Sequence, residues 1–508
     1  MKNLSIFLLL VVTVPIVFLV GCATVEEVQL TSVEKNLEAE VIKENWMEIY
    51  MFGGKVGYAH YYVKESRNGY EIVNEGVMKT KRSGVEIESR QISRAYVDED
   101  FSPKYFIYRE LVGRQEKLVE GGIQGNELRV RASLADTFIE KTFDIDKEIF
   151  LESSVGEVVT RKGLAVGNCY RFKVFDERFL EILEETFDIE RKERIEFEGR
   201  EREAYRVKRM HSGLKGMTIT EWLDLEGNML KYEVKELGLS MVRVKKEEAQ
   251  RWDSIIDLGQ TGHIRSNVEI SNLDRISQMR IRLSIEEGDI AQFLASDRRQ
   301  RIELQDEDGV ILNIRKIKFE DYESLNLPLK DERYRKFLEP TLYAQSENKE
   351  ISQKAREIIE GEENAWRASK RLSDWVHKNL RMGQIETPFA SAEEVLESRE
   401  GDCSEHATLF VALARAAGIP ARVCDGIVYI GEAFDYHMWA EVYVGEWIAI
   451  DPTRGQSEVD VTHIKFGDAV LDSASLIRLS LNMARTINNL DLKILSYTVD
   501  SKEIRVIE

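Results

Sequence analysis

Residues 401–407 read Gly-Asp-Cys-Ser-Glu-His-Ala and run into Thr-Leu-Phe-Val-Ala-Leu-Ala-Arg-Ala-Ala at 408–417. The apolar residues of the second stretch share one helical face, and Gly418 marks the helix end. Asp402 stands where a helix start is capped, which puts Cys403 in the first turn. The helix dipole favours negative charge there, so this location suits a thiolate nucleophile.

Three strand-like segments follow this helix, at 422–429, 437–444 and 446–451. The last two predict a hairpin whose register depends on the length of its loop. A loop of three residues pairs Tyr443 with Trp447 and places Asp451 diagonal to His437 on the same sheet face, within side-chain reach. A loop of two residues would place them on opposite faces.

The order GDCSEHA, then GIPAR, then HMWAEVYVGEWIAIDPT resembles the transglutaminase-like superfamily, which has a papain-like arrangement. The resemblance covers about residues 350–455. It implies that Cys403 is the nucleophile, that His437 is the general base and acid, and that Asp451 orients His437. The implied intermediate is a thioester acyl-enzyme, whose acyl group then passes to water or to an amine.

The remaining site predictions concern oxyanion donors, a competing base and metals. The Cys403 backbone N–H is one expected oxyanion donor, and Gln384 is the upstream side chain predicted as the second. His406, one helical turn after Cys403, is a competing base that ranks below His437. The sequence has no CxxC pair, clustered histidines or EF-hand spacing, and thiol chemistry needs no metal, so no metal or cofactor is predicted.

The N-terminus predicts export and anchoring. Residues 4–20 are almost wholly apolar after a short positive start, and the segment ends in Leu-Val-Gly-Cys at 19–22. This resembles a bacterial lipoprotein signal peptide (1–21) whose lipobox cysteine, Cys22, is acylated; a plain transmembrane anchor is the alternative. The polar, Glu-rich residues 22–45 are predicted to be a tether. Either anchor places the protein in the cell envelope, facing away from the cytoplasm.

Length and charge narrow the choices further. The 508 residues predict two or three domains. The formal net charge of -20 argues against general nucleic-acid binding and against electrostatic adhesion to anionic lipid. A disulfide between Cys169 and Cys424 is permitted outside the cytoplasm, but two buried thiols are expected. The oligomeric state is not indicated.

The fold class predicted is α+β. Residues 46–260 alternate apolar and polar residues after turn signals at 68–69, 125–126 and 226–228, which predicts an antiparallel β-rich domain, with 178–190 as a helical interruption. Residues 261–348 predict a second β-rich segment with a hairpin about Asp308-Gly309, either a separate small domain or a continuation of the first. Helical periodicity then opens the transglutaminase-like helix-plus-antiparallel-sheet domain, residues 349–508.

The sequence therefore predicts an envelope-anchored thiol enzyme that acts on amide bonds of proteins or peptides, by hydrolysis or by acyl transfer to an amine. Its partners would be a protein or peptide substrate and the membrane, reached through lipid on Cys22. The alternative is a non-catalytic binding or assembly lipoprotein that uses the same domain as a scaffold, since a fold and a motif do not prove turnover.

Overall fold

A computed structural model describes residues 40–82, 85–145, 148–252, 255, 263–286, 288–329, 331–383, 389–487 and 489–506. The predicted signal peptide, Cys22, most of the tether and Gln384 lie outside these residues. Within the described ranges, no helix has the length and apolarity needed to cross a bilayer. The chain forms two compact units, which divide between Asp257 and Leu258.

One fifteen-stranded sheet builds the N-terminal unit. Its strands are β1 (Glu40–Met51), β2 (Gly54–Ser66), β3 (Gly69–Arg82), β4 (Val85–Val97), β5 (Pro103–Val112), β6 (Gln115–Gln124), β7 (Glu127–Leu134), β8 (Thr137–Asp144), β9 (Phe150–Leu151), β10 (Cys169–Asp176), β11 (Glu181–Phe197), β12 (Arg200–His211), β13 (Ile219–Leu223), β14 (Met229–Val234) and β15 (Leu239–Val244). The helices are α2 (Val155–Lys162) and α3 (Lys246–Ala249). The spatial order runs from β8 back to β1, then from β15 back to β9.

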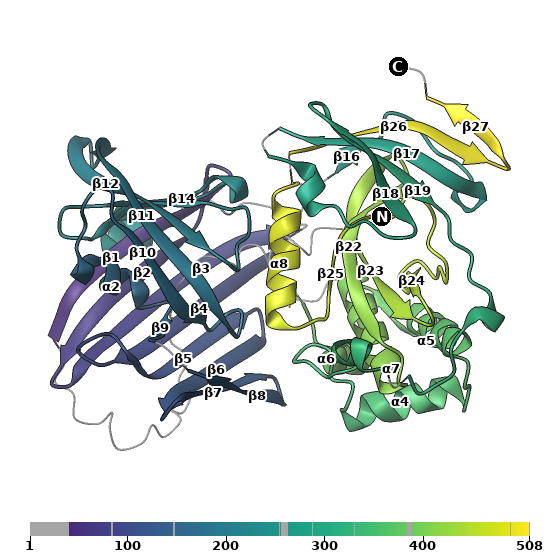
Figure 1. The fold of residues 1–508 in the computed structure, drawn as a ribbon, viewed down its shortest axis with the longest axis horizontal. Helices are drawn as coiled ribbons and strands as arrows, with labels where there is room; N and C mark the ends of the chain where they lie inside the picture. Colours follow the sequence, from purple (N-terminus) through teal and green to yellow (C-terminus); the bar gives the residue numbers. More distant parts are fainter. Residues whose placement is uncertain are drawn as a thin grey trace. The chain divides into compact units, whose positions relative to one another are not determined.

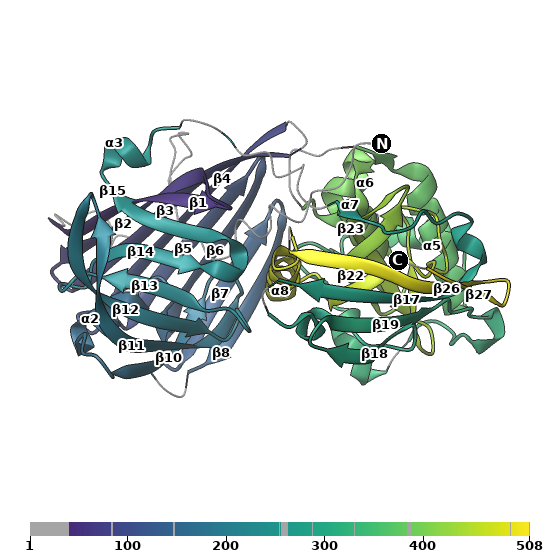
Figure 2. The ribbon, with the colours of Figure 1, turned by 90° about the horizontal axis from the view of Figure 1, so that it is seen from above.

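The sheet joins two antiparallel meanders through the β1–β15 pair and bends so that its two halves face each other (Figure 2). Phe106 of β5 contacts Phe175 of β10 across the interior, with ring centroids 5.3 Å apart. Strand β1 shows why one face is buried: Met47, Ile49 and Met51 alternate with more exposed residues and point inward. The predicted strands after the three turn signals are present as β3, β7 and β14.

Two predictions about this unit were wrong. Residues 181–190 belong to strand β11, not to a helix, because Leu183, Glu185, Phe187 and Ile189 are buried at a spacing of two, which is strand periodicity. Cys169 is an exposed free thiol rather than a buried one. It opens β10 on the face that also exposes Arg171 and Lys173.

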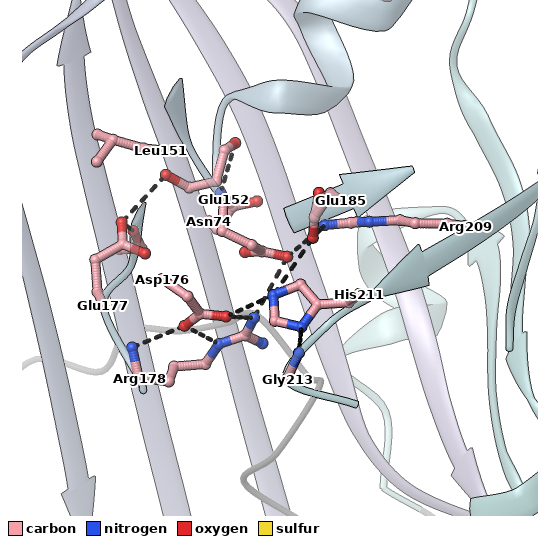
Figure 3. Close-up of polar contacts among 12 residues, drawn as sticks. Asn74, Leu151, Glu152, Asp176, Glu177, Arg178, Glu185, Arg209, His211 and Gly213 are labelled. Carbon is pink, nitrogen blue, oxygen red and sulfur yellow. Dashed lines mark hydrogen bonds and ion pairs between the residues drawn. The ribbon is translucent and has the colours of Figure 1, made fainter. Parts of the chain in front are cut away.

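Ion pairs join β10, β11, β12 and the turn after β9 inside this unit (Figure 3). The Arg178 guanidinium lies 2.6 Å from an Asp176 carboxylate oxygen and 3.4 Å from Glu152. The Arg209 guanidinium lies 2.7 Å from both Glu152 and Glu185. Glu152 therefore bridges the two arginines and ties the turn after β9 to two other segments.

Carboxylates outnumber guanidinium groups around this cluster. Glu221, which lies 3.3 Å from Arg209, has its pKa raised by burial. Burial, reinforced by the charge of Asp176, raises the pKa of Glu177 to about 8, so this carboxyl is largely protonated at neutral pH. A cavity of about 130 Å³ lies beside Arg209. We interpret the cluster as a buried polar network that joins segments of the curved sheet.

Two five-stranded sheets and a group of helices build the C-terminal unit. Its strands are β16 (Ile264–Arg265), β17 (Ile276–Ile285), β18 (Gln300–Asp306), β19 (Gly309–Arg315), β20 (Arg381–Met382), β21 (Glu400–Gly401), β22 (Ala421–Ile430), β23 (Ala433–Tyr443), β24 (Trp447–Ile450), β25 (Ile464–Ala469), β26 (Leu490–Val499) and β27 (Lys502–Arg505). Its helices are α4 (Lys349–Ile359), α5 (Ala365–Asn379), α6 (Ala392–Ser398), α7 (Cys403–Ala416) and α8 (Ser473–Ala484).

The two five-stranded sheets of this unit have different strand orders. One has the order β16-β23-β22-β25 with β24 on β23, and the other has the order β18-β19-β17-β26-β27. The hairpin predicted about Asp308-Gly309 is confirmed, since Asp306 pairs with Gly309 between β18 and β19. Strand β17 from the predicted second β-rich segment also pairs with β26 near the C-terminus. The described chain is α+β, as predicted.

Helix α7 lies among α4, α5 and α6 in the C-terminal unit, beside strand β23 (Figure 1). It packs against β22 and β23 on one side and against α4, α5 and α6 on the other. Every residue from 403 to 415 is buried, because both faces of the helix are covered. The N-terminal end of α7, where Cys403 lies, is therefore held from several directions.

Candidate active site

Helix α7 begins at Cys403, as the sequence predicted, and a capping box fixes its start. The Asp402 carboxylate accepts the Ser404 backbone N–H at 3.0 Å, and Glu405 accepts the Asp402 backbone N–H at 3.0 Å. Glu405 folds back over Gly401, where an added Cβ would lie 2.3 Å from the Glu405 Cβ. The glycine in the GDCSE sequence is therefore required by the cap itself.

The Cys403 thiol is buried, with 1% of the residue exposed. Its sulfur interacts with the backbone N–H of Met438, the residue that follows His437 on β23. Burial raises the pKa of the thiol well above its usual range, and the charge of Asp402 adds to this, while the Met438 N–H lowers it. Desolvation therefore acts against the charge preference of the helix N-terminus and favours the neutral form of the thiol.

His437 lies on β23 directly opposite Gly426 of β22. A Cβ at Gly426 would approach the Ile464 carbonyl oxygen to 1.8 Å and the Trp439 ring to 3.1 Å. A glycine is therefore needed where β22 passes between β25 and the Trp439 indole. The His437 side chain is 2% exposed in this setting.

Of the two registers considered for the β23–β24 hairpin, the structure has the one that the proposed triad requires. Tyr443 pairs with Trp447, so the loop has three residues, and the strands continue in step to Ala440 opposite Ile450. Asp451 follows at the end of β24, and its Oδ2 accepts a hydrogen bond from His437 Nε2 at 2.8 Å. The other carboxylate oxygen, Oδ1, accepts the backbone N–H groups of Thr453 at 2.9 Å and Arg454 at 3.0 Å.

These contacts hold Asp451 ionised. Burial acts to raise its pKa, but the charges and hydrogen bonds of His437 and His463 hold the pKa well below its usual range. An ionised carboxylate only accepts hydrogen bonds, so His437 carries its proton on Nε2. The second ring nitrogen, Nδ1, is buried and makes no hydrogen bond. It is the free atom with which His437 can take the proton of the neighbouring thiol.

His463 is a site residue that the sequence reasoning missed. Its Nε2 lies 3.1 Å from the same Asp451 Oδ2 that bonds His437, and its Nδ1 lies 3.3 Å from Asp460. It lies ten positions after Thr453, the last residue of the Asp-Pro-Thr sequence, and belongs to no recognised motif. The one available signal was that Asp-x-x-His can place two polar side chains together in a turn.

The other predicted site residues are less central. His406 uses Nδ1 to donate to the Asp402 carbonyl of its own helix at 2.6 Å, and burial lowers its pKa. This bond holds the His406 ring against the start of its own helix, whereas His437 bonds the Asp451 carboxylate. Gln384 lies outside the described residues, so the second oxyanion donor stays a prediction.

One trio of described residues has the spacing that a metal ion would need. The ligand atoms of His437, Asp451 and His463 lie within 4.8 Å of one another. Those atoms, however, already form the two hydrogen bonds to Asp451 Oδ2. An ion would have to replace both bonds, so we describe the trio as a hydrogen-bonded cluster.

Comparison with known families identifies a domain in this part of the chain. Residues 352–452 match the family model described as the transglutaminase-like superfamily, so the chain contains a transglutaminase-like domain. The predicted family is confirmed for this part of the chain. A comparison with curated proteins found no match.

Solved structures include three remote relatives. A candidate cysteine protease from Cytophaga hutchinsonii has 18% identity and a TM-score of 0.29, covering 46% of this chain and 89% of that one. A beta-barrel-like protein of a domain of unknown function from Brucella abortus has 15% identity and a TM-score of 0.32, covering 40% and 95%. A candidate protease from Parabacteroides distasonis has 12% identity and a TM-score of 0.19, covering 69% and 68%.

Proposed function

We propose that the protein is an envelope-anchored thiol enzyme that acts on amide bonds of proteins or peptides. The observation that carries the proposal is the arrangement around His437, whose Nε2 donates to Asp451 at 2.8 Å while Nδ1 is free and buried. Cys403 lies against the backbone N–H of Met438, the residue that follows His437 on β23. A Cys–His–Asp mechanism requires the observed His–Asp bond and a thiol close to the free imidazole nitrogen.

The proposed reaction begins with a neutral thiol. As the Cys403 sulfur attacks the amide carbonyl carbon, its proton passes to His437 Nδ1, and the C–S bond forms. The protonated imidazole, stabilised by Asp451, then gives this proton to the leaving amine as the C–N bond breaks. A thioester remains on Cys403. Attack by water gives a carboxylic acid, whereas attack by an amine gives a new amide, and either step frees the thiol.

The start of α7 is suited to stabilise the oxyanion of this reaction. The first N–H groups of a helix have no intrahelical acceptor, and Cys403 occupies the first position. A carbonyl oxygen bound there would also face the positive end of the helix dipole. The second donor is proposed to be Gln384.

One observation favours a second candidate, a non-catalytic binding or assembly lipoprotein. The thiol is 1% exposed, and burial holds its pKa well above the usual range, whereas reactive cysteines are commonly accessible thiolates. On this alternative the domain serves as a scaffold, and Cys403 is a small buried residue.

Alkylation of individual cysteines by iodoacetamide, followed by mass spectrometry, separates the two candidates. Cys169 is exposed and provides a reference thiol in the same molecule. For an enzyme, we expect His437→Ala to slow Cys403 alkylation at pH 7 without changing Cys169. Equal Cys403 rates in both proteins would support the scaffold.

Anchoring is proposed from the lipobox sequence that ends at Cys22. Replacement by Cys22→Ser should release the protein from membranes and abolish incorporation of radiolabelled palmitate. Continued lipid labelling of this variant would contradict the lipoprotein assignment. An unlabelled protein that stays in the membrane fraction only through its apolar segment would point to the transmembrane alternative.

A further inference from the structure

Asp451 is shared by two buried imidazoles rather than one. Its Oδ2 lies 2.8 Å from His437 Nε2 and 3.1 Å from His463 Nε2. His463 itself is 0% exposed. A buried carboxylate oxygen with two hydrogen-bond donors is held in one position more firmly than one with a single donor. His463 lies beyond residue 452, where the family match ends.

A second carboxylate holds His463 from its far side. His463 Nδ1 lies 3.3 Å from Asp460 Oδ1, and this oxygen also accepts the Thr462 backbone N–H at 2.9 Å. The Gln456 side chain donates to the other Asp460 oxygen at 2.9 Å. The side chains thus form a continuous buried chain, Asp460–His463–Asp451–His437.

The carboxylates on both sides favour an imidazolium at His463. Burial lowers its pKa, but Asp460 and Asp451 together raise it above the usual value. With both ring nitrogens protonated, His463 donates to Asp460 and to Asp451 at once. Its positive charge then offsets part of the Asp451 charge that stabilises protonated His437.

The neighbouring cations Arg299 and Lys465 are bonded elsewhere and do not substitute for His463 between the two carboxylates. Arg299 donates to the main-chain carbonyls of Asp460 and His463 rather than to their side chains. Lys465, two residues further on, lies 2.8 Å from Glu441 and 3.0 Å from Asp468. On the β23 side, the edge of the His463 ring meets Trp439, with centroids 5.2 Å apart.

We infer that His463 is a positioning residue of the thiol site: it holds the Asp451 carboxylate in place against His437 through a buried Asp460–His463–Asp451 chain. The inference rests on the proposed function, because it assigns His463 a role through His437 and Asp451. It extends the site by two residues that no motif indicated.

The test compares two variants of the full chain across pH 5–10, with iodoacetamide as the probe and Cys169 as the internal reference. His463→Gln can still donate one hydrogen bond to Asp451 but cannot carry charge, whereas His463→Leu can do neither. Removing a nearby positive charge makes every deprotonation in the Cys403–His437 pair harder. We expect the midpoint of the Cys403 profile to rise by about one pH unit in His463→Gln, which is about a tenfold change in the protonation ratio.

His463→Leu should show the same shift and a lower limiting rate, which the glutamine variant restores. The matched control is His377→Gln, a histidine that contacts the Thr453 carbonyl at 3.1 Å but touches neither Asp451 nor Asp460. The control should keep the wild-type midpoint. A wild-type midpoint in both His463 variants would overturn the inference, since a purely structural residue would change stability alone.

Two further results keep the test decisive. If the His463 variants do not fold, ¹⁵N-histidine NMR of the wild-type protein takes their place: a His463 ring protonated on both nitrogens at pH 7 supports the inference, and a ring with one bare nitrogen overturns it. If His437→Ala leaves Cys403 alkylation unchanged, the proposed function itself has failed. A profile that depends on His437 but not on His463 rejects only the inference.

Discussion

The substitution Asp451→Asn should inactivate the Cys403 thiol by reversing the tautomer of His437. In the wild-type protein, His437 donates from Nε2 to Asp451 Oδ2 at 2.8 Å, which leaves Nδ1 free to accept a proton. An asparagine keeps its carbonyl oxygen towards the Thr453 and Arg454 N–H groups that now bond Oδ1. Its NH₂ group then faces His437, so the imidazole must accept at Nε2 and carry its proton on Nδ1.

The size of the effect follows from the bond that is lost. A hydrogen bond to an ionised group contributes about 1.5–3 kcal/mol, which corresponds to a rate loss of roughly 10- to 160-fold. We expect Cys403 alkylation by iodoacetamide at pH 7 to fall within this range, while Cys169 is unchanged. Asp374→Asn, an exposed residue paired with Lys378 at 3.2 Å, is the control and should react like wild type. An Asp451→Asn protein that is folded by circular dichroism and reacts within about twofold of wild type would refute the tautomer argument.

Three further predictions concern stability and access. Burial and Asp176 raise the pKa of Glu177 to about 8, so its protonated form stabilises the fold fully below the ordinary value near 4.5, and that stability is lost as pH rises towards 8. The free energy of unfolding of Glu177→Gln, measured in urea, should therefore rise relative to that of wild type between pH 5 and pH 8. Parallel pH profiles for the two proteins would contradict the raised pKa of Glu177. Arg209→Met leaves three buried carboxylates without their ion-pair partner, so the free energy of unfolding should fall by about 3–5 kcal/mol in the same assay. Arg202→Ala, whose exposed pair with Glu198 is 3.0 Å long, should cost less than about 1 kcal/mol, and equal costs would reject the network. Finally, the labelling rate of Cys403 divided by that of exposed Cys169 should be at least about tenfold lower with a bulky polyethylene-glycol maleimide than with small iodoacetamide, because Cys403 is 1% exposed. The same rate ratio with both reagents would mean that the Cys403 thiol is accessible to large molecules.

Helix α7 and the β23–β24 hairpin could be predicted from local patterns, although the sequence left two registers of the hairpin open. The cap on α7 joins Asp402 to Ser404, two residues away, so the sequence carries the whole interaction. The β23–β24 register depends on a loop of three residues, and the Tyr443–Trp447 pair follows from that length. Cys403, His437 and Asp451 could therefore be proposed together, because the short motifs that contain them resemble those of a known superfamily.

Features that depend on distant segments could not be predicted. No local pattern indicates that β17 pairs with β26, since Met279 and Tyr497 meet across more than two hundred residues. Strand β11 is rich in glutamate and arginine, so its strand periodicity becomes visible only through the burial of Leu183 and Phe187. The raised pKa of the Cys403 thiol arises from the way α7 is covered on both sides, which a capping motif does not indicate.

His463 illustrates the same limit within the site. Its contact with Asp451 depends on how the chain turns after β24 and enters β25, and no spacing rule describes that path. The site residues that could be identified from the sequence are those that lie in short motifs. The residue that holds them in place was found only from its two hydrogen bonds.

The measurement that tests the central claim most directly is the capture of an acyl group on Cys403. The protein is mixed with p-nitrophenyl acetate, the release of p-nitrophenolate is followed in time, and the acylated cysteine is located by mass spectrometry after quenching in acid. We expect an early burst of p-nitrophenolate with an S-acetyl group on Cys403, absent in Cys403→Ala and strongly slowed in His437→Ala. Acetylation that favours exposed Cys169, or a burst that His437→Ala leaves intact, would contradict the assignment of a thiol enzyme.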